Sequence, residues 1–237
     1  MMASVTAELG ATGRRPAVVA FDVIETLFSL ESLRPRLRAI GLPAHALEAW
    51  FAQLLRDAFA LDCVGIYKPF REIATATLER LLLKASIDYD DEQLAGVIDG
   101  FTQLEAHPDV APAMNALRNA GIRIVTLTNG SARATEMLLE RAGLREYVER
   151  SVSIDEVKRW KPAREVYLHC AEVVGISPDR VALVAAHAWD IQGAKRAGLS
   201  AGYVERSEGP FLSIFDPPEV VGSTLVEVVE LLMKLQT

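Results

Sequence analysis

The chain alternates short apolar runs with longer amphipathic segments. The apolar runs cover residues 17–21, 122–128, 152–154, 181–185 and 201–204. Their hydrophobic character is typical of strands in a parallel sheet that is buried on both faces. Segments with helical periodicity fill the intervals, at residues 112–120, 131–142, 162–174 and 190–197. Gly143 and Gly198 each follow a helical segment, where glycine commonly ends a helix. The alternation predicts an α/β protein with a Rossmann-like parallel sheet and helices on both faces.

One interval, between the first and second predicted strands, contains no strand pattern. Helical periodicity covers residues 44–61, 69–86 and 91–104 within it. Because this interval is too long for a simple crossover, we expect an all-helical cap inserted after the first strand. Such a cap can close over the carboxyl ends of the strands and exclude water from a reaction. The predicted domains are a mobile leader (1–16), an α/β core (17–31 and 105–237) and a helical cap (32–104).

Composition restricts the classes of function. Half of the 237 residues are hydrophobic, but no apolar run approaches the ~20 residues that a membrane-spanning helix needs. The net charge of −7, without a lysine-rich block, argues against a nucleic-acid partner. A small anionic substrate is still compatible with this charge, because a few local cations can outweigh the mean. Cys63 and Cys170 lie far apart in the sequence, which favours two reduced thiols and a cytoplasmic location.

Chemically versatile residues follow four of the predicted strands. They are Asp22 with Thr26, the segment 128–131, Lys161 with Pro162, and the segment 185–190. Taken singly, each is more often a helix cap or a surface charge. In a parallel sheet, however, the carboxyl ends of the strands meet at one edge, and ligands bind there. The shared position of these residues therefore predicts a single active site.

These motifs resemble those of the haloacid dehalogenase superfamily, and in detail those of the L-2-haloacid dehalogenases (type II). The segment FDVIETLF resembles FDxYGTLF, and LTNGSARATEMLLERAGL resembles LSNGS followed by a helix that ends in AGL. SIDEVKRWKPAREVY resembles SVDxVxxxKPxxxVY, and HAWDIQGAKRAG resembles NAWDxxGAKxxG. The similarity extends from about residue 17 to residue 205 and includes the helical insertion.

The resemblance implies a hydrolase that works without a metal or another cofactor. Asp22 would be the nucleophile, which attacks a substrate carbon and forms an ester that water later hydrolyses. Thr26 would hydrogen-bond Asp22, and Lys161 would keep Asp22 ionised, because a nearby cation favours the charged carboxylate. The remaining matches are Thr128 (substrate carboxylate), Asn129 (neighbourhood of the departing halide), Asp190 (partner of the lysine), Trp189 (an aromatic residue beside Asp190) and Tyr167 (a family tyrosine that follows the lysine). Trp189 and Tyr167 are placed with the residues that bind substrate.

The position two residues after the nucleophile separates two kinds of chemistry. Superfamily phosphatases carry a second aspartate there, as a general acid, and bind Mg²⁺ beside it. Ile24 occupies this position and can do neither. With Asp190 as the one downstream acid, the oxygen donors fall short of the near-octahedral set that Mg²⁺ prefers. Dehalogenases have tyrosine at this position, so Ile24 argues against phosphoryl transfer and is placed in the substrate pocket.

Two further departures concern the dehalogenase chemistry itself. Phe51 stands at the position of the family's halide-binding arginine, and Trp50 and Phe59 are expected to make this pocket more apolar. His187 replaces an asparagine of the motif that positions the hydrolytic water. It has two interpretations, a general base for that water or a neutral histidine bonded to a neighbouring loop.

The favoured hypothesis is therefore a metal-independent hydrolase that displaces halide from a small 2-haloalkanoic acid. One alternative is a Mg²⁺-dependent phosphatase of small metabolites. Another is a relative that binds a ligand without turnover, which the nucleophile and lysine oppose. The expected partner is a small anionic substrate, with no nucleic acid and no membrane. The family resemblance also suggests a homodimer, although no sequence pattern specifies an interface.

Overall fold

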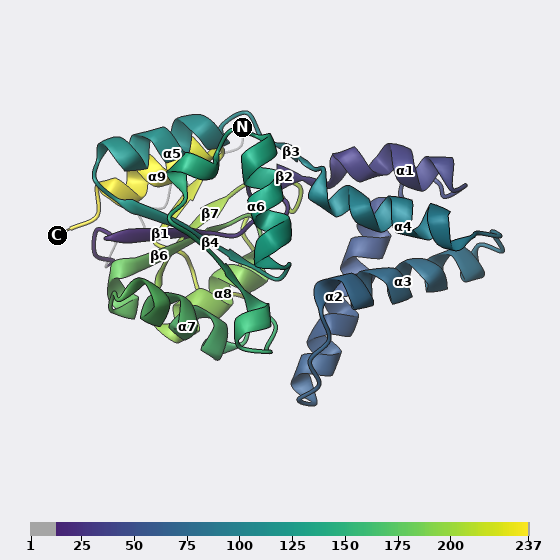
Figure 1. The fold of residues 1–237 in the computed structure, drawn as a ribbon. Coiled ribbons are helices and arrows are strands. Elements are labelled where there is room, and N and C mark those ends of the chain that lie inside the picture. The colour runs from purple at the N-terminus through teal and green to yellow at the C-terminus, as the bar shows by residue number, and fades with distance from the viewer. Residues whose placement is uncertain (1–12, 237) are drawn as a thin grey trace, which may run out of the picture.

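The computed structural model describes residues 13–236, and its centre is a six-stranded parallel sheet (Figure 1). The strand order is β5-β4-β1-β6-β7-β8. The strands are β1 (Val18–Phe21), β4 (Arg123–Thr128), β5 (Arg150–Ser153), β6 (Val181–Ala185), β7 (Ser200–Val204) and β8 (Val220–Gly222). The five predicted strands are thus present. The sixth, β8, was not predicted, because three residues are too few to establish an apolar run.

Helices cover both faces of this sheet, as predicted. In Figure 1, α5 (Val110–Asn119) and α9 (Leu225–Met233) lie on one face, and α7 (Arg164–Val174) and α8 (Ala188–Ala197) lie on the other. Helix α6 (Ala132–Arg141) packs beside β5. Gly143 and Gly198 have φ values of +67° and +92°, which confirms the left-handed conformation expected after α6 and α8.

The insertion between β1 and β4 is helical, and it begins and ends at a short antiparallel pair of strands. This pair is β2 (Phe28–Ser29) with β3 (Glu105–Ala106). Between them lie η1 (Leu30–Leu33), α1 (Arg34–Ala39), α2 (Ala46–Cys63), α3 (Phe70–Lys84), α4 (Asp91–Asp99) and η2 (Gly100–Thr102). Figure 1 shows these helices grouped beside one end of the sheet. The two-residue strands were missed, because a period of two cannot be recognised over so short a length.

The last turn of α2 and the loop that follows it are anchored to the core segment that carries Lys161. Asp62 accepts hydrogen bonds from the side chain of Arg159 (3.0 Å) and from the backbone N–H of Trp160 (2.9 Å). The indole N–H of Trp160 donates in turn to the carbonyl of Lys68 (2.9 Å). These contacts hold the helical insertion over the carboxyl ends of the strands.

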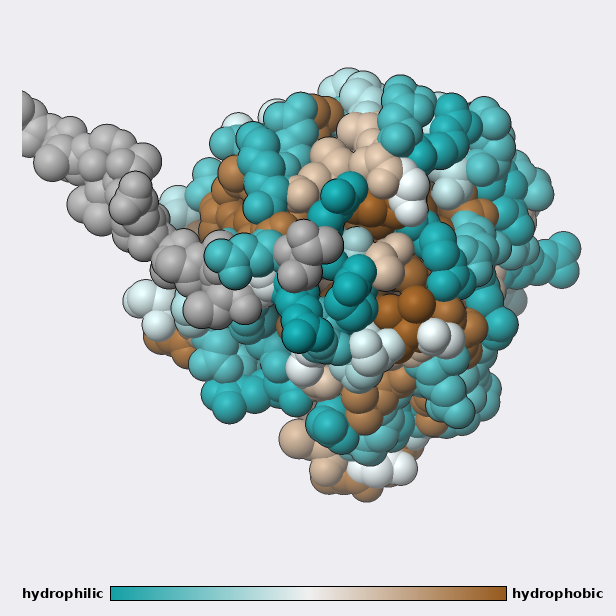
Figure 2. Space-filling view, turned by 90° about the vertical axis from the view of Figure 1, so that its left-hand side faces the viewer, coloured by the Kyte–Doolittle hydropathy of each residue, from teal (hydrophilic) through white to brown (hydrophobic). Residues whose placement is uncertain are grey.

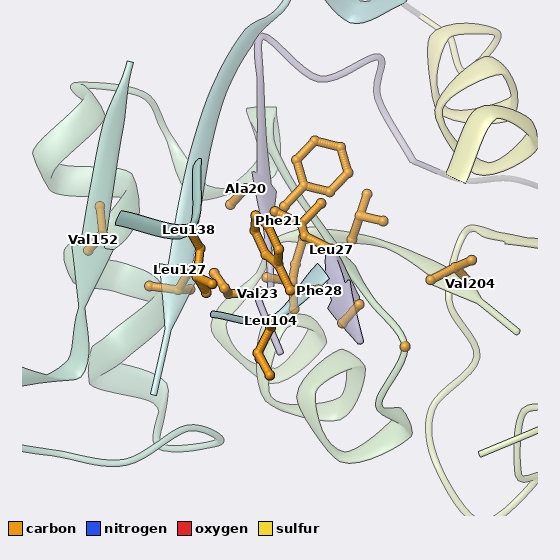
Figure 3. Packing of buried hydrophobic residues seen from close by; sticks show 14 of the residues in the cluster. Ala20, Phe21, Val23, Leu27, Phe28, Leu104, Leu127, Leu138, Val152 and Val204 are labelled. Atoms are coloured by element: carbon orange, nitrogen blue, oxygen red, sulfur yellow. The ribbon is translucent and has the colours of Figure 1, made fainter. Parts of the chain in front are cut away.

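Strand β1 lies at the centre of the apolar core. Its residues are fully buried, and Figure 3 shows labelled members of the surrounding cluster, among them Phe21, Val23 and Phe28. β1 pairs with β4 on one side and with β6 on the other, because the chain continues from β1 to β4 and β5 and then crosses back to form β6 on the opposite side. A crevice forms at such a switch point, at the carboxyl end of the strand. The fold therefore places Asp22, which follows β1, at the natural ligand site of this sheet.

The end of the core far from the helical insertion presents a mostly hydrophilic surface, with hydrophobic residues exposed between polar ones (Figure 2). Within residues 13–236, no helix is long and apolar enough to cross a membrane. Residues 1–12, which make up most of the predicted leader, lie outside the described part of the chain.

Candidate active site

Asp22 lies at the carboxyl end of β1 and is 5% exposed. Its position is fixed by the backbone, because its N–H donates to the carbonyl of Val184 on β6 (3.0 Å). One carboxylate oxygen, Oδ1, accepts a hydrogen bond from Lys161 Nζ (2.7 Å), and Oδ2 accepts one from Thr26 Oγ1 (2.7 Å). The Thr26 hydroxyl accepts in turn from the N–H of Ala186 (2.9 Å). The carboxylate is thus held in one orientation.

Lys161 is completely buried and lies between two carboxylates. Its ammonium group donates to Asp22, to Asp190 Oδ2 (2.6 Å) and to the carbonyl of Leu127 (3.0 Å). Asp190 is held on its other side by the hydroxyl of Tyr167, which donates to Oδ1 (2.6 Å). All three protons of the ammonium group have acceptors, so this buried cation is fully compensated.

The electrostatics of this group favour an ionised Asp22 side chain. Burial by itself raises the pKa of Asp22, but the charges of Lys161 and His187 outweigh it and hold the pKa below its usual value. Burial likewise opposes the charge on Lys161, and Asp190 and Asp22 nevertheless raise its pKa. Asp22 therefore remains a carboxylate in a site that excludes most water.

Gly193 on α8 makes room for this arrangement. A Cβ atom at residue 193 would lie 2.4 Å from the hydroxyl oxygen of Tyr167 and 2.7 Å from the Cβ of Pro162. Real Cβ atoms do not approach other atoms so closely, so a side chain here would displace Tyr167 from Asp190. The role of Gly193 was not predicted from the sequence, because its only local signal is a glycine inside a helix.

His187 precedes α8 and faces Asp22, with 4.0 Å between its Nε2 and Oδ2 of the carboxylate. Its other ring nitrogen, Nδ1, is 2.7 Å from Glu208 Oε1, and the second oxygen of Glu208 accepts from the N–H of Ala188 (3.1 Å). Burial alone lowers the pKa of His187, but Glu208 and Asp22 raise it above its usual value. The carboxylate of Glu208 fixes a tautomer with the proton on Nδ1, which leaves Nε2 directed toward Asp22.

Glu208 lies in the loop between β7 and β8 and was not predicted from the sequence. It is 21 residues from His187, and no motif connects the two positions. His187 is therefore bonded to a neighbouring loop, as one of the two interpretations expects, but its raised pKa does not favour the neutral form that this interpretation includes. This contact also supports the predicted general base, because it orients the imidazole.

A small cavity of about 10 Å³ lies next to Asp22. Its lining residues are Asp22, Ile24, Phe51, Leu55, Phe70, Thr128, Asn129, His187 and Trp189. This volume holds about one water molecule. The cavity is lined by the predicted site residues that were expected to contact substrate or water, with the exception of Tyr167. Tyr167 and the remaining catalytic candidates, Thr26, Lys161 and Asp190, lie behind the carboxylate.

Aromatic rings form one wall of this cavity. His187 stacks on Trp189, with ring centroids 5.2 Å apart and an interplanar angle of 15°, and Phe51 lies 6.1 Å from His187. Phe59 contacts Trp189 edge to face at 5.2 Å. Trp50, in contrast, does not reach the cavity, since it is buried among cap helices and its indole N–H bonds Ala74 and Thr77. The expectation for Phe51 and Phe59 agrees with this geometry, and that for Trp50 was wrong.

Polar donors are available within this mainly apolar wall. The indole N–H of Trp189 is buried and has no hydrogen-bond partner among residues 13–236. Thr128 Oγ1 accepts from the N–H of Gly130 (2.9 Å), so its own proton is free to donate. Asn129 Oδ1 accepts from the N–H of Lys161 (3.0 Å), which leaves the Asn129 amide N–H₂ as a donor. Arg56 lies outside the cavity, with a 62% exposed side chain that pairs with Asp57.

The donor set does not fit a catalytic Mg²⁺ ion. Each oxygen of Asp22 already accepts a hydrogen bond, from Lys161 or from Thr26, and Ile24 supplies no oxygen from its side chain. In the described part of the chain, no three His, Cys, Asp or Glu side chains are grouped so that they could hold a metal ion. The ammonium group of Lys161 occupies the position from which a cation would contact both carboxylates.

Comparison with known proteins agrees with this geometry. The family profile described as haloacid dehalogenase-like hydrolase matches residues 16–198. (S)-2-haloacid dehalogenase 1 of Pseudomonas sp. (strain CBS-3) is 27% identical over 217 residues, which cover 91% of this chain and 96% of the relative. Haloacetate dehalogenase H-2 of Moraxella sp. (strain B) is 25% identical over 218 residues, or 90% and 96% of the two chains.

A solved structure shares the whole fold. It is the L-2-haloacid dehalogenase of Xanthobacter autotrophicus with chloropropionic acid covalently bound, with a TM-score of 0.84, 22% identity and coverage of 92% of this chain and 99% of that chain. Fold and site together define a capped α/β enzyme with a buried aspartate at the end of its first strand. Because the profile covers most of the chain, the chain belongs to the haloacid dehalogenase-like hydrolases. The resemblance inferred from the motifs is confirmed.

Proposed function

We propose that this protein is a 2-haloacid dehalogenase that works through an aspartyl ester and without a metal. The observation that carries the proposal is the buried Asp22 carboxylate, which Lys161 keeps ionised and which faces a cavity with aromatic walls. A desolvated, oriented carboxylate is a competent nucleophile at carbon. The activities in the names of the relatives support the same conclusion.

In the first step, a carboxylate oxygen of Asp22 attacks C2 of the substrate, and the carbon–halogen bond breaks. The halide leaves with the bonding electrons, and the indole N–H of Trp189 and the amide of Asn129 are the donors for it. The hydroxyl of Thr128 donates to the substrate carboxylate and holds C2 above Asp22. Phe51 contributes the weakly positive edge of its ring in place of an arginine.

In the second step, water attacks the Cγ atom of the Asp22 ester. His187 Nε2 takes one proton of this water, while Glu208 holds the proton on Nδ1. The bond between Cγ and the substrate oxygen breaks, the oxygen takes the proton from Nε2, and a 2-hydroxy acid leaves. The carboxyl of Asp22 then loses its proton again. Because the ester carries no charge, the Asp22 contribution that raises the pKa of His187 is absent in this step, so the imidazole becomes a base when one is needed.

The buried polar group behind Asp22 stabilises the resting carboxylate and orients Lys161. Asp190 and Tyr167 act through the lysine, since neither lines the cavity.

We include in the proposal that residues 32–104 act as a cap domain over a core of residues 17–31 and 105–237. Exposed Cys63 and buried Cys170 are free, which supports the proposed cytoplasmic location. The homodimer also belongs to this proposal, and Val64 and Ile66, exposed by 70% and 47%, are contact residues to test by light scattering.

The decisive experiment measures halide release from 2-chloro- and 2-bromopropanoate, with EDTA and with Mg²⁺, beside a panel of phosphate esters. We expect halide release that EDTA does not affect. Asp22→Asn is expected to abolish it, whereas Asp88→Asn, at an exposed position of the cap, serves as the matched control. A single turnover in H₂¹⁸O should place ¹⁸O in Asp22. Phosphate release that requires Mg²⁺, without halide release, would instead support the phosphatase.

His187 has its own test within this scheme. His187→Ala should allow the ester on Asp22 to form and should slow its hydrolysis by about 10²–10⁴-fold, the range typical of a general base. The ester then accumulates and is detectable by mass spectrometry after rapid quenching. Hydrolysis at the wild-type rate in this variant would exclude His187 as the base.

A further inference from the structure

A second, larger cavity lies next to the one that contains Asp22. Its volume is about 260 Å³, and its walls come from both the core and the helical insertion. The core side includes Val23 and Leu138, which are labelled in Figure 3. The opposite side is formed by α3, α4 and η2, with Phe70, Ile98 and Phe101.

The two cavities share three wall residues, Ile24, Phe70 and Thr128. A substrate carbon above Asp22 is therefore separated from the larger cavity only by these side chains. The smaller cavity has room for about one water molecule, so it cannot also contain a long substrate chain. The space for any further part of the substrate lies beyond Ile24 and Phe70.

The lining of the larger cavity indicates the chemistry of its occupant. Most of it is apolar, which is typical of sites for small organic ligands. The charged lining residues are Arg71, Arg133 and Asp155. Arg71 and Arg133 are exposed and lie toward solvent, and the carboxylate of Asp155 accepts a hydrogen bond from the hydroxyl of Tyr67. Arg71 is already paired with Asp99 (2.7 Å). Met137, a 39% exposed apolar side chain, also lines the cavity.

We propose that this cavity is a subsite for the apolar chain of the substrate, and that the enzyme favours 2-haloalkanoic acids with chains of several carbons beyond C3. This proposal rests on the dehalogenase function proposed above and specifies its substrate class. The halogen occupies the cavity at Asp22, the carboxylate lies at Thr128, which lines both cavities, and the chain extends past Ile24 and Phe70 into the larger cavity. Transfer of the apolar chain from water into this cavity is sufficient to produce this preference.

The test compares kcat/KM for 2-bromopropanoate, 2-bromobutanoate, 2-bromohexanoate and 2-bromooctanoate. Each methylene that leaves water should raise kcat/KM by about fourfold until the cavity is filled. Ala134 on α6 lines the cavity, so Ala134→Phe should fill it and strongly reduce the ratio of kcat/KM for the hexanoate to that for the propanoate. Ala132→Phe, on the same helix but outside both linings, is the matched control and should keep the wild-type ratio.

Binding of unhalogenated acids separates this proposal from the dehalogenase function. The dissociation constants of propanoate, hexanoate and octanoate should fall with chain length in the wild type and not in Ala134→Phe. Halide release with equal kcat/KM for all the 2-bromoalkanoates would exclude the subsite and would still support the dehalogenase function. If no acid releases halide, the dehalogenase function is excluded. The subsite is then supported if the dissociation constants of the unhalogenated acids fall with chain length, and excluded if they do not.

Discussion

Replacing Lys161 by methionine tests whether the buried charges are as tightly compensated as their geometry indicates. Methionine has a similar volume to lysine and carries no charge. The substitution leaves Asp22 and Asp190, whose side chains are 7% and 0% exposed, without their shared cation. Removing one partner of a buried ion pair typically costs about 3–5 kcal/mol.

The site can relieve part of this cost by taking up a proton. Keeping a carboxyl protonated at pH 7 costs about 4 kcal/mol, because each pH unit above its ordinary pKa of about 3.9 adds roughly 1.4 kcal/mol. At pH 5 the same calculation gives about 1.5 kcal/mol. Without the lysine the folded-state pKa of this pair is raised, so the loss of stability is small near the unfolded-state pKa and grows as the pH rises.

The assay is urea unfolding of the wild type and Lys161→Met at pH 5 and at pH 7. We expect a loss of about 4 kcal/mol at pH 7, equivalent to roughly 8–16 °C in Tm for a chain of this size, and a much smaller loss at pH 5. Lys68→Met is the control, because Lys68 forms an exposed pair with Glu72 (2.6 Å) and such pairs contribute at most about 1 kcal/mol. A loss that is equal at the two pH values, or below about 1 kcal/mol at pH 7, would refute this account of the buried charges.

Two further predictions follow from contacts around this group. Gly193→Ala should lower stability by about 1–3 kcal/mol and reduce turnover, because the new Cβ displaces Tyr167; Gly96→Ala, inside α4 with nothing within 4 Å, should instead stabilise by roughly 0.5–1 kcal/mol in thermal unfolding. Glu208→Gln should lower the pKa of His187 and move the acidic limb of the pH–kcat profile to lower pH. The stability that Glu208 adds is present below about pH 6.5, the ordinary histidine pKa, and is lost as the pH rises through the raised value. An unchanged pH profile and an unchanged pH dependence of unfolding would contradict this role.

The sequence predicted those parts of the fold that depend on local periodicity. The apolar runs around β1, β4 and β6 are continuous because the strands are buried on both faces, so the sheet could be recognised without coordinates. Residues at the ends of these strands meet because the strands are parallel, and this geometry brings Asp22 and Lys161 together. The family motifs supplied the remaining site residues by position.

The tertiary structure decided the contacts that no local pattern encodes. Glu208 reaches His187 from a loop whose path depends on how β7 and β8 pack, and the need for glycine at residue 193 appears only when Tyr167 is placed against α8. The cap is a second case in which tertiary packing decides the contacts. Its helices follow from their periodicity, but which of their side chains face the core depends on how they pack against it. That packing buries Trp50 within the cap, places Phe51 beside Asp22 and leaves the larger cavity beyond Phe70. The sequence alone therefore determined the longer elements and the position of the proposed nucleophile, whereas the short strands and the shape and electrostatic surroundings of the site depend on long-range packing.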